Sequence, residues 1–238
     1  MSMQENKSGG FFITGTDTDV GKTYVAARII KAFAQSGVRV SGFKPVASGA
    51  VQLQGRWVNS DALKLMEQAS VKLPYEKVNP YCFEPAIAPH IAAQQATVVI
   101  DQQVILSSYS KHLEQAELVI VEGAGGWKVP LTDDLGFDDV ASSLDLPVIL
   151  VVGVKLGCIN HALLTEEAIV NKGCRLTGWV ANSCSANFEQ LAENLEALNK
   201  RMNSPCLGVL RHQVVGEKDT ELDQKELSSL LACLSKFR

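Results

Sequence analysis

The chain has 238 residues, which is enough to bury a large core without disulfides or a structural metal. Apolar residues make up 46% of it and charged residues 20%, as is usual for globular proteins. The formal net charge of −4 offers no basic excess for a nucleic-acid backbone, so we expect no nucleic-acid partner, although a nucleotide needs only local positive charge.

The first ten residues are polar and carry no apolar signal region, so we expect a disordered leader over 1–10 and a single domain over 11–238. The six cysteines include no C-x-x-C pair, which indicates neither a zinc site nor a disulfide framework. The longest apolar stretch, 146–157, is too short and too interrupted to span a bilayer. We therefore expect a cytoplasmic protein with reduced thiols and no membrane partner.

Short apolar runs alternate with longer amphipathic segments along the rest of the chain. Their hydrophobicity is continuous rather than alternating, which is typical of strands buried on both faces of a parallel sheet. The predicted strands are 11–14, 38–44, 117–123, 147–153, 176–182 and 205–210. The predicted helices are 22–35, 101–115, 160–172, 187–202, with Asn187 as a possible cap, and 219–234.

This alternation predicts an α/β fold with a doubly wound, mainly parallel sheet flanked by helices. In such folds ligands bind beyond the carboxyl ends of the strands, so the residues just after each strand are the candidates for function.

The stretch TGTDTDVGKT follows the first predicted strand and opens the first predicted helix. This is the setting of a phosphate loop, in which backbone N–H groups and a helix start face an anion. Gly15 lies one residue further from Gly21 than in the usual G-x-x-x-x-G-K-[ST] spacing, and Thr16 takes the place of the first glycine. In such a loop Lys22 reaches the β- and γ-phosphates and the Thr23 hydroxyl ligates Mg²⁺. The alternative is a helix start with a chance Gly-Lys-Thr.

Polar groups also follow two other predicted strands. Glu122 ends the third strand before a glycine-rich turn, where an acid can contact Mg²⁺ or can simply end the strand. Lys44 ends the second strand before a proline and small residues that let a ligand approach, although it can also be a surface lysine. The run NSDALKL resembles a helix capped by Asn59 or Ser60, in which Asp61 favours the positive helix end.

The stretch VKLGCINHALLT follows the fourth predicted strand and opens a helix. Its backbone N–H groups can bind a carboxylate, or it can be an ordinary strand-to-helix turn. Cys158 has no evident base partner in the sequence, and His161 lies in a helical run, so we do not pair them as nucleophile and base.

Together these pieces closely resemble the dethiobiotin synthetase family. The matching stretches follow the family's order from about residue 11 to 182 and read TGTDTDVGKT, KPVASG, NSDAL, VNPY, PHIAA, VEGAGGW, LPVILVVGVKLGCINHA and GWVAN. The extra residue in the phosphate loop is also found in that family. Arg211 stands where relatives commonly have proline, which leaves the choice of nucleotide open. Asp19 stands where they have glutamate, so the carboxylate is kept but is shorter by one methylene.

The resemblance implies an ATP- and Mg²⁺-dependent ligase that converts 7,8-diaminononanoate and CO₂ to dethiobiotin, ADP and phosphate, through a carbamate and a carbamic-phosphoric anhydride. It implies Lys22 and Lys44 as catalytic cations, and a homodimer with a shared site. The residues implied as Mg²⁺ ligands are Thr23, Asp61 and Glu122. The residues implied at the substrate are Thr18, Ser48, Gly157, Cys158 and Asn160, the last three reaching across from the second subunit. The residues implied at the nucleotide are Thr18, Asp19, Val20, Gly21, Lys22, Thr23, Tyr24, Asp61, Glu122, Gly123, Ala124, Gly125 and the adenine-reading Asn182.

Three other functions fit parts of the sequence. A switch ATPase acting on a protein partner shares the expected fold, but such proteins usually have a second lysine early in the phosphate loop, and residues 16–20 contain none. An amidotransferase synthetase related to cobyric acid synthesis needs a glutaminase domain for which this chain has no room. A non-catalytic nucleotide-binding relative is the third alternative. It is disfavoured because every residue type needed to bind phosphate and magnesium is present in this sequence.

Overall fold

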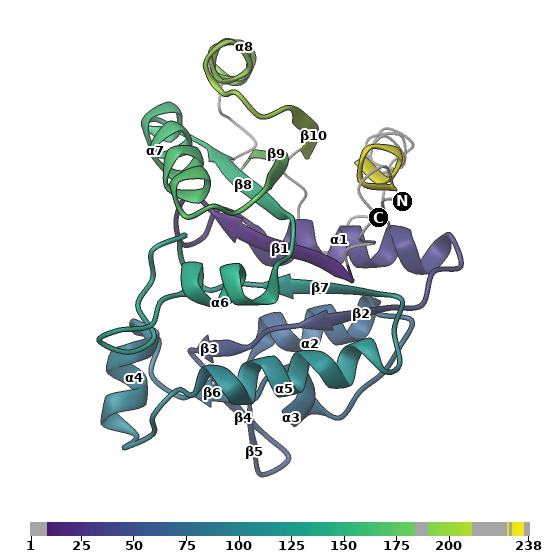
Figure 1. The fold of residues 1–238 in the computed structure, drawn as a ribbon, viewed down its shortest axis with the longest axis vertical. Coiled ribbons are helices and arrows are strands. Elements are labelled where there is room, and N and C mark those ends of the chain that lie inside the picture. Colours follow the sequence, from purple (N-terminus) through teal and green to yellow (C-terminus); the bar gives the residue numbers. More distant parts are fainter. Residues whose placement is uncertain (1–8, 184–189, 211–227, 229, 236–238) are drawn as a thin grey trace, which may run out of the picture.

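The computed structural model describes residues 9–183, 190–210, 228 and 230–235. In this part of the chain the centre is a six-stranded sheet in the order β10-β9-β8-β1-β7-β2, and every neighbouring pair is parallel (Figure 1). Its strands are β1 (Gly10–Gly15), β2 (Val40–Phe43), β7 (Leu118–Glu122), β8 (Val148–Val154), β9 (Leu176–Ser183) and β10 (Cys206–Leu210).

Helices cover both faces of this sheet (Figure 1). One face packs on α1 (Lys22–Gln35), whose Val25, Ile29 and Phe33 meet alternate residues of β1, β7 and β8. The other face packs on α5 (Gln102–Leu113), α6 (Phe137–Leu144), α7 (Cys158–Asn171) and α8 (Leu191–Arg201). Because successive side chains of a strand point to opposite faces, Phe11 and Phe12 of β1 belong to the two different cores.

The strand order places a crevice at the carboxyl end of β1. After β1 the chain forms β2 and then β7 on one side, and later returns to form β8 on the other side. A reversal of this kind leaves the loops after the two neighbouring strands pointing apart, which is where open α/β sheets bind ligands. The loop that leaves this point is TDTDV at 16–20.

A smaller layer lies between β2 and α5 in the sequence and flanks the same end of the sheet. It contains the parallel pair β3 (Val46–Ser48) and β6 (Tyr81–Phe83), and the antiparallel pair β4 (Val51–Leu53) and β5 (Arg56–Val58). Its helices are α2 (Ser60–Gln68), α3 (Tyr75–Val78) and α4 (Pro89–Gln95). This layer supplies the wall opposite the phosphate loop.

All six predicted strands and the doubly wound parallel arrangement are confirmed. One boundary is wrong: Gly10, which we expected in the leader, is the first residue of β1, because its backbone pairs in register with Val119 of β7. Asn187 and most of the predicted helix 219–234 lie outside the described residues. None of the described helices is long and apolar enough to cross a membrane.

Candidate active site

The phosphate loop closes on the start of α1 through a glycine in the left-handed region. Gly21 has a φ of 87° and serves as the N-cap of the helix without a side-chain cap. A Cβ at this position would lie 2.1 Å from Nδ2 of Asn182, which donates a hydrogen bond of 3.0 Å to the Val20 carbonyl. The N–H groups of the first turn of α1 point toward the N-terminal end of the helix, where this loop lies, as an anion site requires.

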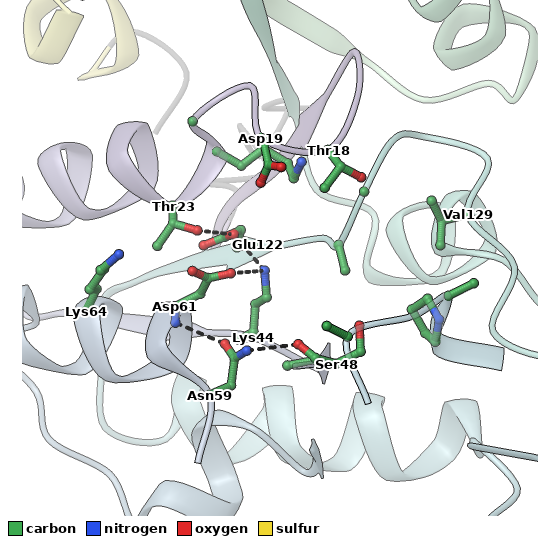
Figure 2. A pocket seen from close by; sticks show the side chains of 18 of the residues that line it. Thr18, Asp19, Thr23, Lys44, Ser48, Asn59, Asp61, Lys64, Glu122 and Val129 are labelled. Atoms are coloured by element: carbon green, nitrogen blue, oxygen red, sulfur yellow. Dashed lines mark hydrogen bonds and ion pairs between the residues drawn. The ribbon is translucent and has the colours of Figure 1, made fainter. Parts of the chain in front are cut away.

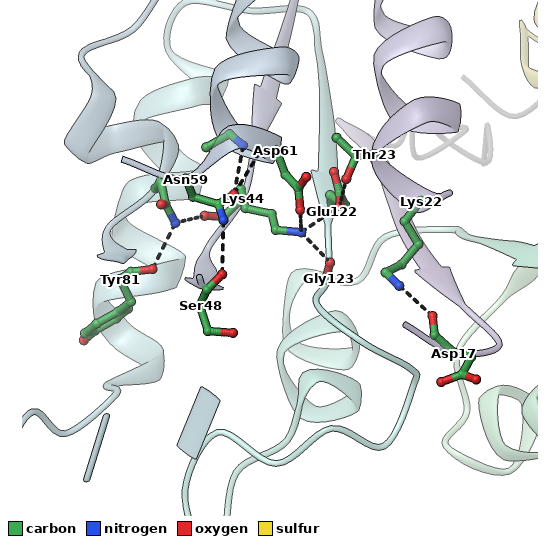
Figure 3. Close-up of polar contacts among 12 residues, drawn as sticks. Asp17, Lys22, Thr23, Lys44, Ser48, Asn59, Asp61, Tyr81, Glu122 and Gly123 are labelled. Carbon is green, nitrogen blue, oxygen red and sulfur yellow. Dashed lines mark hydrogen bonds and ion pairs between the residues drawn. The ribbon is translucent and has the colours of Figure 1, made fainter. Parts of the chain in front are cut away.

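Lys22 folds back over this loop rather than extending to solvent (Figure 3). Its Nζ donates to the carbonyl of Asp17 at 2.7 Å, and the residue is buried. Burial, and after it the charge of Lys44, lower the pKa of Lys22 to about 8. A buried ammonium held by one carbonyl is a strong point charge for an incoming phosphate oxygen, because little water competes for it.

The two acids and the second lysine meet at the end of β7 (Figures 2 and 3). Oε1 of Glu122 lies 2.6 Å from Nζ of Lys44 and accepts a 2.7 Å hydrogen bond from the Thr23 hydroxyl. The same ammonium lies 3.3 Å from Oδ2 of Asp61 and donates to the Gly123 carbonyl at 3.1 Å. Four segments that are separate in the sequence thus converge on one cluster.

Lys44 stays charged in this cluster. Burial alone would lower its pKa, but the carboxylates of Glu122 and Asp61 outweigh burial and raise it. The side chain is almost fully buried, so removal of either partner would leave an uncompensated charge in a low-dielectric site.

The residues present fit a magnesium ion. Oε2 of Glu122 is buried and makes no hydrogen bond, which is unusual for a carboxylate oxygen and leaves it available as a ligand. The Thr23 hydroxyl is hydrogen-bonded to the other oxygen of Glu122, and the half-buried Asp61 carboxylate shares the Lys44 ammonium with Glu122. All three side chains offer the hard oxygens that Mg²⁺ prefers. Within the described residues no three His, Cys, Asp or Glu side chains lie close enough together to hold a metal ion. The two carboxylates and one hydroxyl of this site would therefore need further oxygen ligands, such as those of phosphates and water.

A cavity of about 880 Å³ opens over this cluster, large enough for a nucleotide together with a small substrate (Figure 2). Most of the predicted site residues line it: Thr18, Asp19, Gly21, Lys22, Thr23, Tyr24, Lys44, Ser48, Asp61, Glu122, Ala124 and Gly125. The side chain of Val20 is instead buried in the core, and Gly123 contributes its carbonyl to Lys44.

Several lining residues were missed by the sequence reasoning. Ala47, Val129 and the stretch Ala86–Pro89 form an apolar wall, and Lys64 adds a cation at the rim. The wall lies in loops, in the short strand β3 and at the start of α4, where no periodicity marks a residue as lining a cavity. The proline that begins PHIAA was the one available signal, because proline is favoured in the first turn of a helix.

Besides Val20 and Gly123, four other predicted site residues lie outside this cavity. Asn182 is buried at the end of β9 and contacts the phosphate loop. Gly157, Cys158 and Asn160 open α7, where Gly157 is the N-cap at a φ of 91°. Gly157 and Asn160 are exposed, whereas the Cys158 side chain is buried with its Sγ 3.6 Å from Oδ1 of Asn194, and the Cys158 N–H donates to the Lys155 carbonyl at 3.0 Å.

A lysine and a threonine at a helix start, facing an acid at the end of the adjacent strand, are typical of the P-loop NTPases, and the fold places the chain in that class. MinD of Pyrococcus furiosus superposes with a TM-score of 0.62 at 14% identity, covering 97% of this chain and 100% of that one. A ParA family ATPase of Chlorobium tepidum gives a TM-score of 0.52 at 14% identity, covering 96% and 92%.

The sequence comparisons are more specific. A family model described as an AAA domain matches residues 9–216. ATP-dependent dethiobiotin synthetase of Aromatoleum aromaticum is 46% identical over 85% of this chain and 90% of its own length. That of Pseudomonas aeruginosa (strain UCBPP-PA14) is 49% identical over 83% and 87%. The chain belongs to the ATP-dependent dethiobiotin synthetase family.

Proposed function

We propose that this chain is an ATP-dependent dethiobiotin synthetase acting on 7,8-diaminononanoate and CO₂. The observation that carries the proposal is the cavity that joins two different walls. One wall holds the phosphate loop and two lysines for a nucleotide, and the other is apolar over Ala86–Pro89 and suits a chain of methylene groups. Family membership supplies the reaction.

The chemistry has three steps. One amine of the diamine adds to CO₂ and loses a proton, giving a carbamate. A carbamate oxygen attacks the γ-phosphorus of ATP, ADP leaves, and a carbamic-phosphoric anhydride forms. The second amine attacks the carbonyl carbon and loses a proton, phosphate leaves, and the cyclic urea closes.

The ammonium groups of Lys22 and Lys44 are suited to the second step, in which negative charge is shared by the transferred phosphoryl group and both oxygens in line with it. Fixed cations in a water-poor site stabilise such charge without reorganising. Thr18 and Ser48 border the cavity from opposite sides and would orient the carbamate and the attacking amine. The apolar wall would exclude water from the anhydride.

Thr23, Asp61 and Glu122 would hold Mg²⁺ beside the phosphates. When ATP is bound, the ion would neutralise charge on the phosphate oxygens. Lys44 lies among these same acids, so its ammonium and the ion would share the two carboxylates between them.

We also propose a homodimer in which the start of α7 serves the partner's site. Gly157 and Asn160 are exposed and do not line this chain's own cavity, while the neighbouring Leu156 is 94% exposed. A helix start of this kind would bind the substrate carboxylate. The expected single domain over 11–238 and the cytoplasmic location stay predictions.

The test is a product assay with Mg-ATP, bicarbonate and 7,8-diaminononanoate, read by mass spectrometry. The proposal requires dethiobiotin and ADP only when all components are present. ATP consumption without the diamine, and without any cyclic urea, would instead favour a switch ATPase. Parallel assays with CTP and GTP measure the nucleotide preference that the departure at Arg211 leaves open.

A further inference from the structure

A chain of hydrogen bonds connects the two ends of α3 to the N-cap of α2, and the proposed reaction assigns no role to its members. Its members are Tyr75, Asn79 and Asn59, and neither Tyr75 nor Asn79 lines the cavity. Asn79 is 3% exposed and Asn59 is 5% exposed, so these amides are buried polar groups that need partners.

Asn79 fixes the backbone of Lys44. Its Nδ2 donates to the Lys44 carbonyl at 2.7 Å and to the Tyr81 carbonyl at 3.0 Å. The Lys44 N–H donates in turn to the Val78 carbonyl at 2.8 Å. Both polar groups of the Lys44 backbone are therefore held by the end of α3, which determines where the side chain leaves β2.

Asn59 holds the start of α2 and the end of β3 in place. Its Oδ1 accepts from the N–H groups of Asp61 at 3.0 Å and Ala62 at 3.3 Å, which caps α2 and sets the first turn that carries the Asp61 carboxylate. Its Nδ2 donates to the Ser48 carbonyl at 3.2 Å.

The Tyr75 hydroxyl joins these two groups. It donates to Oδ1 of Asn79 at 2.8 Å and accepts from the N–H of Asn59 at 2.7 Å, with Sγ of Cys82 at 3.4 Å. Burial raises the pKa of this hydroxyl, so it stays protonated and can donate at neutral pH. One oxygen thus connects the support of Lys44 to the support of Asp61 and Ser48.

We propose that Tyr75 is a positioning residue for the reaction, which sets the distance between the Lys44 ammonium and the Asp61 carboxylate and the location of Ser48 through Asn79 and Asn59. It touches neither substrate nor metal. Its effect is expected in the chemical step, because a misplacement of about 1 Å can cost roughly 100-fold in rate. The phosphate loop has its own supports in Asp17 and Asn182, so the affinity for the nucleotide in the absence of Mg²⁺ should not depend on Tyr75.

Tyr75→Phe removes the connecting oxygen and keeps the ring. Tyr81→Phe is the matched control, because the Tyr81 hydroxyl also accepts one backbone N–H, that of Asp101 at 2.9 Å, but leads to α5 rather than to the site. Both variants would be assayed well below their melting temperatures, with rates corrected for the folded fraction.

Three quantities are measured: kcat for dethiobiotin formation, the Kd of a fluorescent ATP analogue without Mg²⁺, and hydrogen exchange of peptides covering 43–48 and 59–65. We expect Tyr75→Phe to lower kcat at least about 10-fold with Kd unchanged within about twofold. Exchange in both peptides should accelerate, and Tyr81→Phe should leave all three quantities at wild-type values.

Equal kcat values and equal exchange in the two variants would overturn the proposal, as would a loss confined to melting temperature. The kinetic part rests on the proposed function, whereas the exchange part does not. If the wild-type protein forms no dethiobiotin, the ligase assignment fails, and the exchange of the two peptides alone decides whether Tyr75 positions these segments.

Discussion

Replacing Gly21 by alanine should destabilise the protein in two ways, through strain in the left-handed backbone and through a collision of the new methyl group with Asn182. Gly21→Ala places a Cβ at a φ of 87° and 2.1 Å from Nδ2 of Asn182. Gly37→Ala, at the other end of α1, places one at a φ of 84° with nothing within 4 Å. The two substitutions therefore share the backbone strain and differ in the collision.

The magnitudes follow from these surroundings. Left-handed backbone costs an alanine about 1–2 kcal/mol, and the loss of glycine's freedom in the unfolded chain returns part of this, so Gly37→Ala should lower the free energy of unfolding by about 1 kcal/mol. In Gly21→Ala the Asn182 amide must also move and release the buried Val20 carbonyl. An unsatisfied buried acceptor adds about 1–3 kcal/mol, for a total of about 2–4 kcal/mol.

Urea unfolding of both variants measures this difference directly. Titration with a fluorescent ATP analogue provides a second measurement, because the collision displaces the first turn of α1. We expect at least about a tenfold weaker Kd for Gly21→Ala, which corresponds to about 1.4 kcal/mol, and no change for Gly37→Ala. Equal losses of stability in the two variants would refute the argument that the Asn182 contact requires glycine at position 21.

Three further perturbations test the site and the fold. Lys44→Met should lower kcat by about 100-fold and change the ATP Kd by less than about threefold, because the charge it faces develops during reaction; a defect confined to nucleotide binding would contradict this. Asn160→Ala should raise the KM for the diamine and leave ATP binding intact, and an ATP-specific defect would exclude it from the carboxylate site. Burial lowers the pKa of His112, and this effect outweighs the hydrogen bond to the Lys77 carbonyl, which raises it. As the pH falls through about 6.5, the unfolded chain therefore takes up the proton before the folded protein does, and the free energy of unfolding decreases. His112→Gln should remove up to about 1.4 kcal/mol per pH unit of this slope in urea unfolding between about pH 7.5 and 5.5, and an unchanged slope would show that His112 is not the group responsible.

The central sheet was predictable because its strands are buried on both faces. A run such as the one in β8 is apolar at every position, so the sequence marks it without knowledge of its neighbours. The short strands of the smaller layer carry no such signal: β4 is exposed along its whole length, and β3 spans only Val46–Ser48. Helix α6 was also missed, since it is short and its N-cap, Gly136, lacks a capping side chain.

Some residues of the candidate site could be predicted from the sequence around them, and others could not. Lys22 and Thr23 follow Gly21 directly, and Glu122 ends a buried strand, so local context was enough to select them. Nothing local selects Asn79 or Tyr75, because their importance arises from contacts with Lys44 and Asn59 across the fold. Sequence reasoning finds groups that face the ligand and misses those that hold them in place.

This division bears on how a function is assigned within a shared fold. MinD and ParA family ATPases have the same architecture at identities too low to carry more than the fold. The phosphate loop, Lys22 and Thr23 form the nucleotide-facing wall, which a P-loop fold of any activity requires. The opposite wall comes from the smaller layer, with Ser48 and the apolar stretch Ala86–Pro89. Variants in that layer should therefore change which acceptor reacts while ATP still binds, and it is there that a ligase of this family would be distinguished from a switch.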